Sequence, residues 1–322
     1  MKTALVLGGG GFIGSHIVNR LLRERFWVRV VDIKRPMFSN SKANDFILGD
    51  LTSEDVVKKA IDQPFDEIYQ LAADMGGAGY IFTGDNDANV MTNSALINLL
   101  VCKNVLKHGC GSIFYSSSAC AYPEYNQLDP DNPRCSEDSA YPAAPDSEYG
   151  WEKLFSERVY SSYKRNHNLN CHIARYHNIY GPEGTYKNGK EKVPAALCRK
   201  IIECDNNGQI DIWGTGSQTR SFLYIDDCVE ATLKLTRSNF AGPVNIGSEE
   251  MISINNFAKL IISISGKNIK INNIKGPIGV NGRNSDNKLI KEKLNWQPSI
   301  SLRDGIKKTY KWIEQDINKN KS

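Results

Sequence analysis

The first half of the chain alternates short apolar runs with longer stretches whose apolar residues recur every three or four positions. Thr3–Leu7 and Val28–Asp32 are typical of buried strands, and the amphipathic stretch Ile13–Glu24 between them is typical of a helix. The pattern continues with expected strands at Phe46–Leu48, Glu67–Leu71, Ser112–Tyr115 and Cys171–Tyr176, and with expected helices at Asn89–Leu106 and Tyr149–Asn166. Strands that alternate with helices predict parallel β–α–β units, so we expect an α/β fold with a doubly wound parallel sheet.

This alternation stops at residues 121–148, which hold five of the twelve prolines of the chain. A long loop of this kind in a compact domain is often functional. After Gly181 the alternation becomes weaker, which predicts a smaller α+β lobe. We therefore expect residues 1–180 to form the larger domain and residues 181–322 to form the smaller lobe, interleaved with the first.

The composition is typical of a globular protein and narrows the choice of partners. Of the 322 residues, 40 are Lys or Arg and 36 are Asp or Glu, a net charge of +4 with no block of like charges, so we expect no nucleic-acid partner. No apolar run approaches the roughly 18 residues that cross a bilayer, and the run before the first glycines is too short for a signal peptide. The eight cysteines form no C-x-x-C pair, which predicts reduced thiols in a cytoplasmic protein and no metal site.

A glycine-rich turn separates the first expected strand from the first expected helix, with Gly8, Gly11 and Gly14 in a G-x-x-G-x-x-G motif. Glycines here let the backbone approach a pyrophosphate, an anion that the helix N-terminus attracts. Asp32 ends the second strand 18 residues after Gly14, where a carboxylate binds ribose hydroxyls and repels a 2′-phosphate. We therefore predict a Rossmann-type domain that binds NAD rather than NADP. The expected cofactor contacts are Gly8, Gly11, Phe12, Ile13, Gly14, Asp32, Asp50, Ala72, Tyr149 and Lys153.

A second pattern suggests acid–base chemistry beside that cofactor. Tyr149 and Lys153 are four residues apart at the start of an expected helix and so share a face, and Ser118 ends a serine run after an expected strand. A tyrosine with a pKa of about 10 is a poor base at neutral pH, but an adjacent ammonium and a positively charged nicotinamide favour its phenolate. A serine hydroxyl can hold the substrate oxygen. Together with the glycine turn, the three residues predict a dehydrogenase-type catalytic set.

These motifs, together with Asn178-Ile179-Tyr180-Gly181-Pro182, resemble those of the extended short-chain dehydrogenase family of nucleotide-sugar enzymes. Within it, five further segments are similar to the GDP-mannose 3,5-epimerases; they span residues 72–77, 117–123, 189–196, 218–222 and 282–287. The similarity runs from residue 3 to about residue 314. Departures lie in the loop 124–138 and at residues 78–80, which flank the sugar pocket and leave open whether the sugar is a hexose or a heptose.

The resemblance implies an isomerase that inverts C3 and C5 of a GDP-sugar, of the GDP-mannose type or a related GDP-heptose. The sugar is oxidised transiently at C4, exchanges protons at C3 and C5, and is reduced again. By resemblance, Cys120 is the base and Lys192 the acid; two residues beyond Ser118, Cys120 points to the same side in an extended chain. A homodimer joined through the helices near 89–106 and 149–166 is also implied. The implied substrate contacts are Met75, Gly76, Gly77, Ser118, Asn178, Lys192, Lys200, Gln218, Arg220 and Arg283.

Three alternative functions are weighed against this one. A GDP-4-keto-6-deoxymannose 3,5-epimerase-4-reductase has a histidine where this chain has Lys192, and it consumes NADPH, which Asp32 disfavours. A 4,6-dehydratase needs an Asp–Glu pair where this chain has Ala119-Cys120. A non-catalytic, NAD-sensing scaffold of the same fold usually lacks the catalytic Tyr or Lys, and both are present here.

Overall fold

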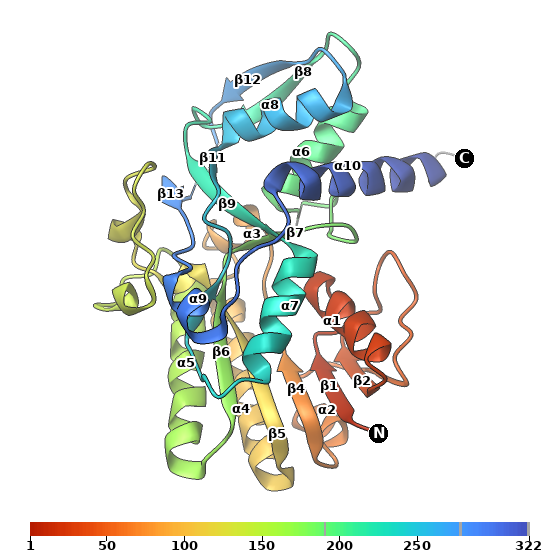
Figure 1. Cartoon of the computed structure of the whole chain (residues 1–322), viewed down its shortest axis with the longest axis vertical. Helices are drawn as coiled ribbons and strands as arrows, with labels where there is room; N and C mark the ends of the chain where they lie inside the picture. The colour runs from red at the N-terminus through yellow and green to blue at the C-terminus, as the bar shows by residue number, and fades with distance from the viewer. Residues whose placement is uncertain (190, 277–278, 321–322) are drawn as a thin grey trace.

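The computed structural model describes residues 1–189, 191–276 and 279–320 (Figure 1). Its main layer is a seven-stranded parallel sheet with the order β10-β6-β5-β4-β1-β2-β3. The strands are β1 (Thr3–Leu7), β2 (Trp27–Asp32), β3 (Asp45–Leu48), β4 (Phe65–Gln70), β5 (Cys110–Ser118), β6 (Cys171–Tyr176) and β10 (Val244–Ile246). The strand order reverses between β1 and β4, which confirms the predicted doubly wound sheet. Ligands of such sheets bind in the crevice at this reversal.

Helices cover both faces of the sheet: α1 (Phe12–Arg23) and α7 (Ile225–Thr236) on one, and α2 (Glu54–Ala60), α4 (Asp87–His108) and α5 (Glu148–His167) on the other. Successive residues of a strand point to opposite faces, so one strand feeds two cores. Ala4 and Val6 of β1 pack into the core under α1 and α7. Leu5 and Leu7 pack into the core under α2, α4 and α5.

A smaller lobe lies above the carboxyl end of the large sheet (Figure 1). It contains β9 (Thr219–Tyr224), which pairs with β7 (Asn178–Tyr180), β11 (Met251–Ser253) and β13 (Gly282–Arg283), and the parallel pair β8 (Gln209–Trp213) and β12 (Lys270–Ile274). Its helices are α6 (Val193–Glu203), α8 (Ile254–Ser265) and α10 (Leu302–Lys319), and α9 (Lys288–Leu294) lies beside β10. Because α7 and β10 return to the large sheet, the two parts are interleaved; the boundary at residue 180 stays a prediction.

Three details differ from the sequence-based expectation. The serine run does not follow β5 but ends it, because Ser116 and Ser117 pair with β6 and their hydroxyls donate to Gln70 O and Glu157 Oε1. The proline-rich loop contains three short 3-10 turns, η1 (Ala119–Ala121), η2 (Glu124–Gln127) and η3 (Glu137–Ala140). Helices α2 and α3 (Ala78–Ile81) were not predicted, since four to seven residues are too few to show a helical period.

Every helix in the described part of the chain is too short or too polar to span a membrane.

Candidate active site

The glycine turn closes tightly between β1 and α1. Gly8 has a φ of +84°, and a Cβ there would lie 2.8 Å from the backbone nitrogen of Ala72. A Cβ on Gly14 would collide with Gly8 O. Gly11 caps α1 without a side-chain hydrogen bond to the first N–H groups of the helix. A close-packed turn that leaves a helix N-terminus open to an anion fits the pyrophosphate of a dinucleotide.

Asp32 lies beside this turn at the end of β2 and is buried. Its carboxylate accepts the N–H of Gly10 at 2.9 Å and the N–H of Lys34 at 3.1 Å. Burial raises the pKa of Asp32, and the two backbone hydrogen bonds act against that rise. A cavity next to Asp32 is lined by Gly10, Gly11, Phe12, Ser15, Lys34 and Glu183, among others. The cradle and the carboxylate therefore fit NAD.

Two further predicted cofactor residues have structural contacts of their own. Ala72 follows β4, and its N–H donates to Gln70 Oε1 at 3.2 Å, which fixes the chain against Gly8. Asp50 is exposed after β3 and accepts the N–H of Thr52 at 2.9 Å in a turn. The adenine contact of Asp50 stays a prediction.

The start of α5 brings Tyr149 and Lys153 against the end of β5. Lys153 is buried, donates its Nζ to Ser116 O at 3.0 Å and lies 5.4 Å from the centre of the Tyr149 ring. Burial lowers the pKa of Lys153, while the carboxylates of Glu152 and Glu157 and the Cys120 thiolate raise it. Burial, followed by the negative charges of Cys120 and Glu152, raises the pKa of Tyr149, and a hydrogen bond with Ser118 lowers it. The net shift of the Tyr149 pKa is upward, opposite to the lowering that the adjacent ammonium was expected to cause.

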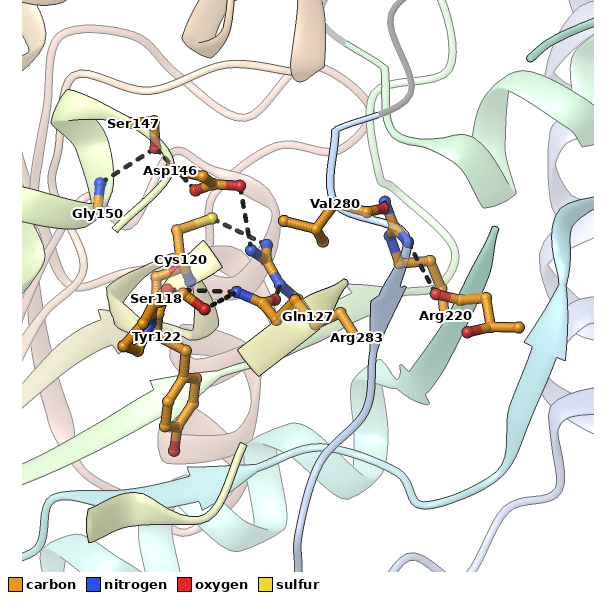
Figure 2. Close-up of polar contacts among 12 residues, drawn as sticks. Ser118, Cys120, Tyr122, Gln127, Asp146, Ser147, Gly150, Arg220, Val280 and Arg283 are labelled. Atoms are coloured by element: carbon orange, nitrogen blue, oxygen red, sulfur yellow. Dashed lines mark hydrogen bonds and ion pairs between the residues drawn. The ribbon is translucent and has the colours of Figure 1, made fainter. Parts of the chain in front are cut away.

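Cys120 reaches the site by a different route from the one the sequence suggested. The chain is not extended after Ser118 but turns at once into η1, and Ser118 caps this turn by accepting the Cys120 N–H at 3.1 Å (Figure 2). The extended-chain argument was therefore wrong, although Cys120 does lie beside Ser118. A Cβ on Gly150 would collide with Cys120 O, so glycine at this position of α5 lets the helix pack directly on the turn.

Lys192 is the N-cap residue of α6, and Pro194 fixes the first turn of that helix. Its side chain is exposed. The protein atoms around its ammonium nevertheless displace water from it and lower its pKa, while the negative charge of Cys120 raises that pKa. The two predicted epimerising residues thus interact electrostatically. Lys190, which belongs to the similar segment 189–196, lies outside the described residues.

Two predicted substrate contacts are arginines close to Cys120. Arg283 of β13 donates to Cys120 Sγ at 3.2 Å (Figure 2). Arg220 of β9 donates to Thr219 O at 2.8 Å and to Val280 O at 2.7 Å. Burial and the nearby Arg283 lower the pKa of Arg220 to about 10. Sequence reasoning missed Asp146 and Gln127, which hold Arg283 from the proline-rich loop; their place in that loop was the one available signal.

The other predicted substrate contacts have hydrogen-bond partners of their own or lie in the segment after β4. Asn178 donates to Ser221 O at 3.0 Å, and Gln218 donates to Trp213 O at 3.1 Å. The buried Oε1 of Gln218 has no partner among the described residues. Lys200, two turns along α6, donates to Asp211 O at 2.8 Å and so faces β8 rather than Cys120. Met75, Gly76 and Gly77 follow β4 just before α3, with Met75 exposed and both glycines buried.

Comparisons with known proteins identify the family to which the chain belongs. Residues 4–247 match the NAD dependent epimerase/dehydratase family, and the chain belongs to this family. It is 44% identical to GDP-mannose 3,5-epimerase from Arabidopsis thaliana over 320 residues, which are 98% of this chain and 83% of that protein. GDP-mannose 3,5-epimerase 1 from Oryza sativa subsp. indica is also 44% identical, over 319 residues and the same shares. Family membership confirms the predicted NAD dependence and the resemblance.

Solved structures support the same fold. UDP-glucose 4-epimerase from Thermotoga maritima, with UDP-glucose, superposes with a TM-score of 0.84 at 25% identity, covering 98% of this chain and 99% of that one. UDP-glucuronic acid 4-epimerase from Bacillus cereus, in complex with UDP-glucuronic acid and NAD, gives 0.81 at 27% identity, covering 97% and 99%. Each of the two superpositions includes both the large sheet and the smaller lobe.

Proposed function

We propose that the chain is a GDP-sugar 3,5-epimerase that acts on GDP-mannose or a closely related GDP-sugar. The observation that carries the proposal is that two proton-handling sets lie close enough to interact, with Cys120 as their common neighbour. Tyr149, Lys153 and Ser118 form the first set, and Cys120 and Lys192 form the second. The identity of 44% to GDP-mannose 3,5-epimerases over almost the whole chain supports the substrate.

The first set serves the oxygen at C4. A C–H bond at C3 or C5 is too weak an acid to exchange unaided, so a ketone must first form at C4. NAD, when bound in the glycine cradle, supplies this by accepting a hydride from C4 and later returning it. Tyr149 takes the proton of the C4 hydroxyl and gives it back, Ser118 holds the oxygen, and the Lys153 ammonium supports the phenolate.

The second set serves the carbons. The Cys120 thiolate takes a proton from C3 or C5, an S–H bond forms, and the electron pair of the C–H bond is delocalised onto the C4 oxygen as an enolate. The Lys192 ammonium gives a proton to the opposite face of the same carbon and becomes a neutral amine. The lowered pKa of Lys192 makes its ammonium a stronger acid than an ordinary lysine. Because Lys192 is exposed and Cys120 is partly exposed, water can return a proton to the Lys192 amine and take the proton of the Cys120 thiol before the second inversion.

The charge around Cys120 favours a nucleoside diphosphate. Among the described residues, the positive charges of Lys192, Arg220 and Arg283 outweigh the carboxylate of Asp146, which pairs with Arg283. Arginine presents a planar fork of donors that suits phosphate oxygens. Arg220, Gln218, Asn178, Lys200 and the segment 75–77 are accordingly proposed to bind the nucleotide and the sugar.

The assembly proposed is a homodimer through α4 and α5. The two helices pack side by side, and large apolar side chains remain exposed on both: Leu96, Leu99 and Leu106 on α4, and Trp151 and Phe155 on α5. Light scattering should give a dimer, and Leu99→Glu combined with Phe155→Glu should give a monomer. A cytoplasmic location is also proposed, supported by eight free thiols, which persist in reducing compartments.

The decisive experiment incubates the purified protein with NAD and GDP-mannose in D₂O and follows the sugar by NMR. Deuterium at C3 and C5, with new GDP-hexoses inverted at those centres, is the expected result. Unreacted GDP-mannose together with consumption of NADPH on GDP-4-keto-6-deoxymannose would indicate the reductase instead. NAD binding without turnover of either sugar would indicate a scaffold.

A further inference from the structure

The sulfur of Cys120 has a cationic neighbour that comes from the far end of the chain. Arg283 Nη1 lies 3.2 Å from Cys120 Sγ, 163 residues away in sequence (Figure 2). The arginine is buried and belongs to β13, which pairs in parallel with β9. The smaller lobe thus delivers a guanidinium to a thiol that the larger domain carries.

Two side chains hold the other nitrogens of this guanidinium. Arg283 Nε donates to Gln127 Oε1, and Nη2 forms an ion pair with Asp146 Oδ2 at 3.5 Å. Gln127 is itself fixed, since its Nε2 donates to the carbonyls of Tyr122 at 3.2 Å and Pro123 at 3.1 Å. Held on two sides, the rigid fork of Arg283 directs Nη1 at the sulfur, as Figure 2 shows.

We propose that Arg283 is a catalytic residue which, oriented by Gln127 and Asp146, stabilises the Cys120 thiolate. The inference rests on the proposed function, in which Cys120 is the base. The family resemblance assigned Arg283 to the substrate; in the structure each of its three nitrogens has a partner within the protein, which leaves two of its five N–H groups for a substrate. Arginine suits this role because it stays protonated at any working pH and donates in fixed directions.

The charges around Arg283 agree with this assignment. Burial by itself lowers the pKa of Arg283, but the negative charges of Cys120 and Asp146 raise it above its ordinary value. The benefit is mutual, because a cation that an anion stabilises also stabilises that anion. Asp146 competes with the sulfur for the same positive charge, so the two partners of Arg283 have opposite effects on the thiolate.

The test measures how fast iodoacetamide alkylates Cys120 in the NAD-loaded protein at pH 7, without sugar. The thiolate attacks the reagent carbon, an S–C bond forms and iodide leaves, so the rate reports the thiolate fraction. Mass spectrometry of the Cys120 peptide gives the rate. Cys204, which is also partly exposed and lies against Asp205 O and Gln209 O, is the internal control in every variant.

Arg283→Met should slow alkylation of Cys120 about tenfold, the order expected for losing a hydrogen bond to a charged group, and leave Cys204 unchanged. Arg283→Lys should recover only part of the rate, because an ammonium cannot contact Gln127, Asp146 and the sulfur together. Asp146→Asn keeps an acceptor oxygen but removes the competing charge, so Cys120 should react about twofold faster.

An unchanged Cys120 rate in Arg283→Met would overturn the inference, and it would do so even if the protein epimerised GDP-mannose, so the proposed function would survive. A slower rate in Asp146→Asn would also overturn it, since loop packing rather than charge would then control the thiol. If Arg283→Met fails to fold, as judged by circular dichroism, Asp146→Asn and Arg283→Lys still decide.

Discussion

The glycine turn and Asp32, at the cofactor end of the site, come from one short stretch of chain, whereas the epimerising end collects its residues from three: the loop region 119–148, the start of α6 and β13. Gly8 to Asp32 form a single β–α–β unit, and their geometry depends on backbone that only glycine allows. Cys120, Gln127, Asp146, Lys192 and Arg283 come from both domains and meet through side-chain contacts. The first end is therefore a property of the fold, and the second depends on how the smaller lobe packs against the proline-rich loop.

The largest effect is expected at the residue that serves both ends. Tyr149→Phe removes one hydroxyl, and we expect turnover of GDP-mannose to fall by about 10²–10⁴-fold, the usual cost of losing a general acid–base group. NMR turnover assays measure this. Tyr163→Phe, on the same helix α5, is the matched control and should stay within about twofold. Near wild-type turnover in Tyr149→Phe would place the C4 chemistry elsewhere.

Removing Cys120 should separate the two ends of the site. In Cys120→Ala, deuterium incorporation at C3 and C5 should fall by at least about a hundredfold, because no base remains, while a 4-keto sugar still forms and can be trapped. Cys120→Ser should be almost as slow, since a hydroxyl is a far weaker acid than a thiol and so provides little basic form near neutral pH. Cys204→Ala is the matched control. Wild-type exchange in Cys120→Ala would exclude this cysteine as the base.

Breaking the cofactor end should affect binding rather than exchange chemistry. Asp32→Ala removes a carboxylate that hydroxyls of NAD would contact, so we expect NAD affinity to fall about 10–100-fold and the preference over NADP to shrink. Calorimetric titration with both nucleotides measures the two values. Asp50→Ala, measured in parallel, should cost NAD affinity only a few fold if Asp50 contacts the adenine. An unchanged NAD-to-NADP ratio in Asp32→Ala would contradict the assignment.

Sequence reasoning succeeded where structure is local and failed where it depends on distant contacts. The expected elements before residue 181 are found within a few residues of their predicted ends. Their apolar residues follow a regular spacing, and a recognisable glycine motif marks the turn between β1 and α1. Cys120 was assigned as the base by resemblance, but the extended chain that was expected to place it on the side of Ser118 does not exist, and a 3-10 turn capped by Ser118 places it instead. Asp146 and Gln127 lie in a loop without periodicity, and the partner that explains them, Arg283, is more than 130 residues away.

The pH dependence should identify Lys192 as the acid. The protein atoms around Lys192 lower its folded pKa, and only the ammonium can donate a proton, so exchange should be lost as pH rises through that pKa. The midpoint of the alkaline limb of the pH profile should therefore lie below the ordinary lysine pKa of about 10.4. Deuterium incorporation measured against pH gives this limb. In Lys192→Arg the alkaline limb should vanish and the remaining exchange rate should be low, because a guanidinium scarcely releases its proton. If the limb stays at the same pH in this variant, it belongs to another group.

The smallest effect is expected at the N-cap of α5, where the test is whether the cap contributes to turnover as well as to folding stability. Ser147 accepts the N–H of Gly150 at 3.3 Å and caps the helix that carries Tyr149 and Lys153. Ser147→Ala should cost about 1 kcal/mol of folding free energy and lower Tm by a few degrees. Ser301→Ala removes an equivalent cap, with the Asp304 N–H at 3.2 Å, from α10 and should cost about as much. Because Ser147 also adjoins Asp146, only Ser147→Ala should slow turnover, by a few fold; equal turnover in both variants would mean that the cap provides stability alone.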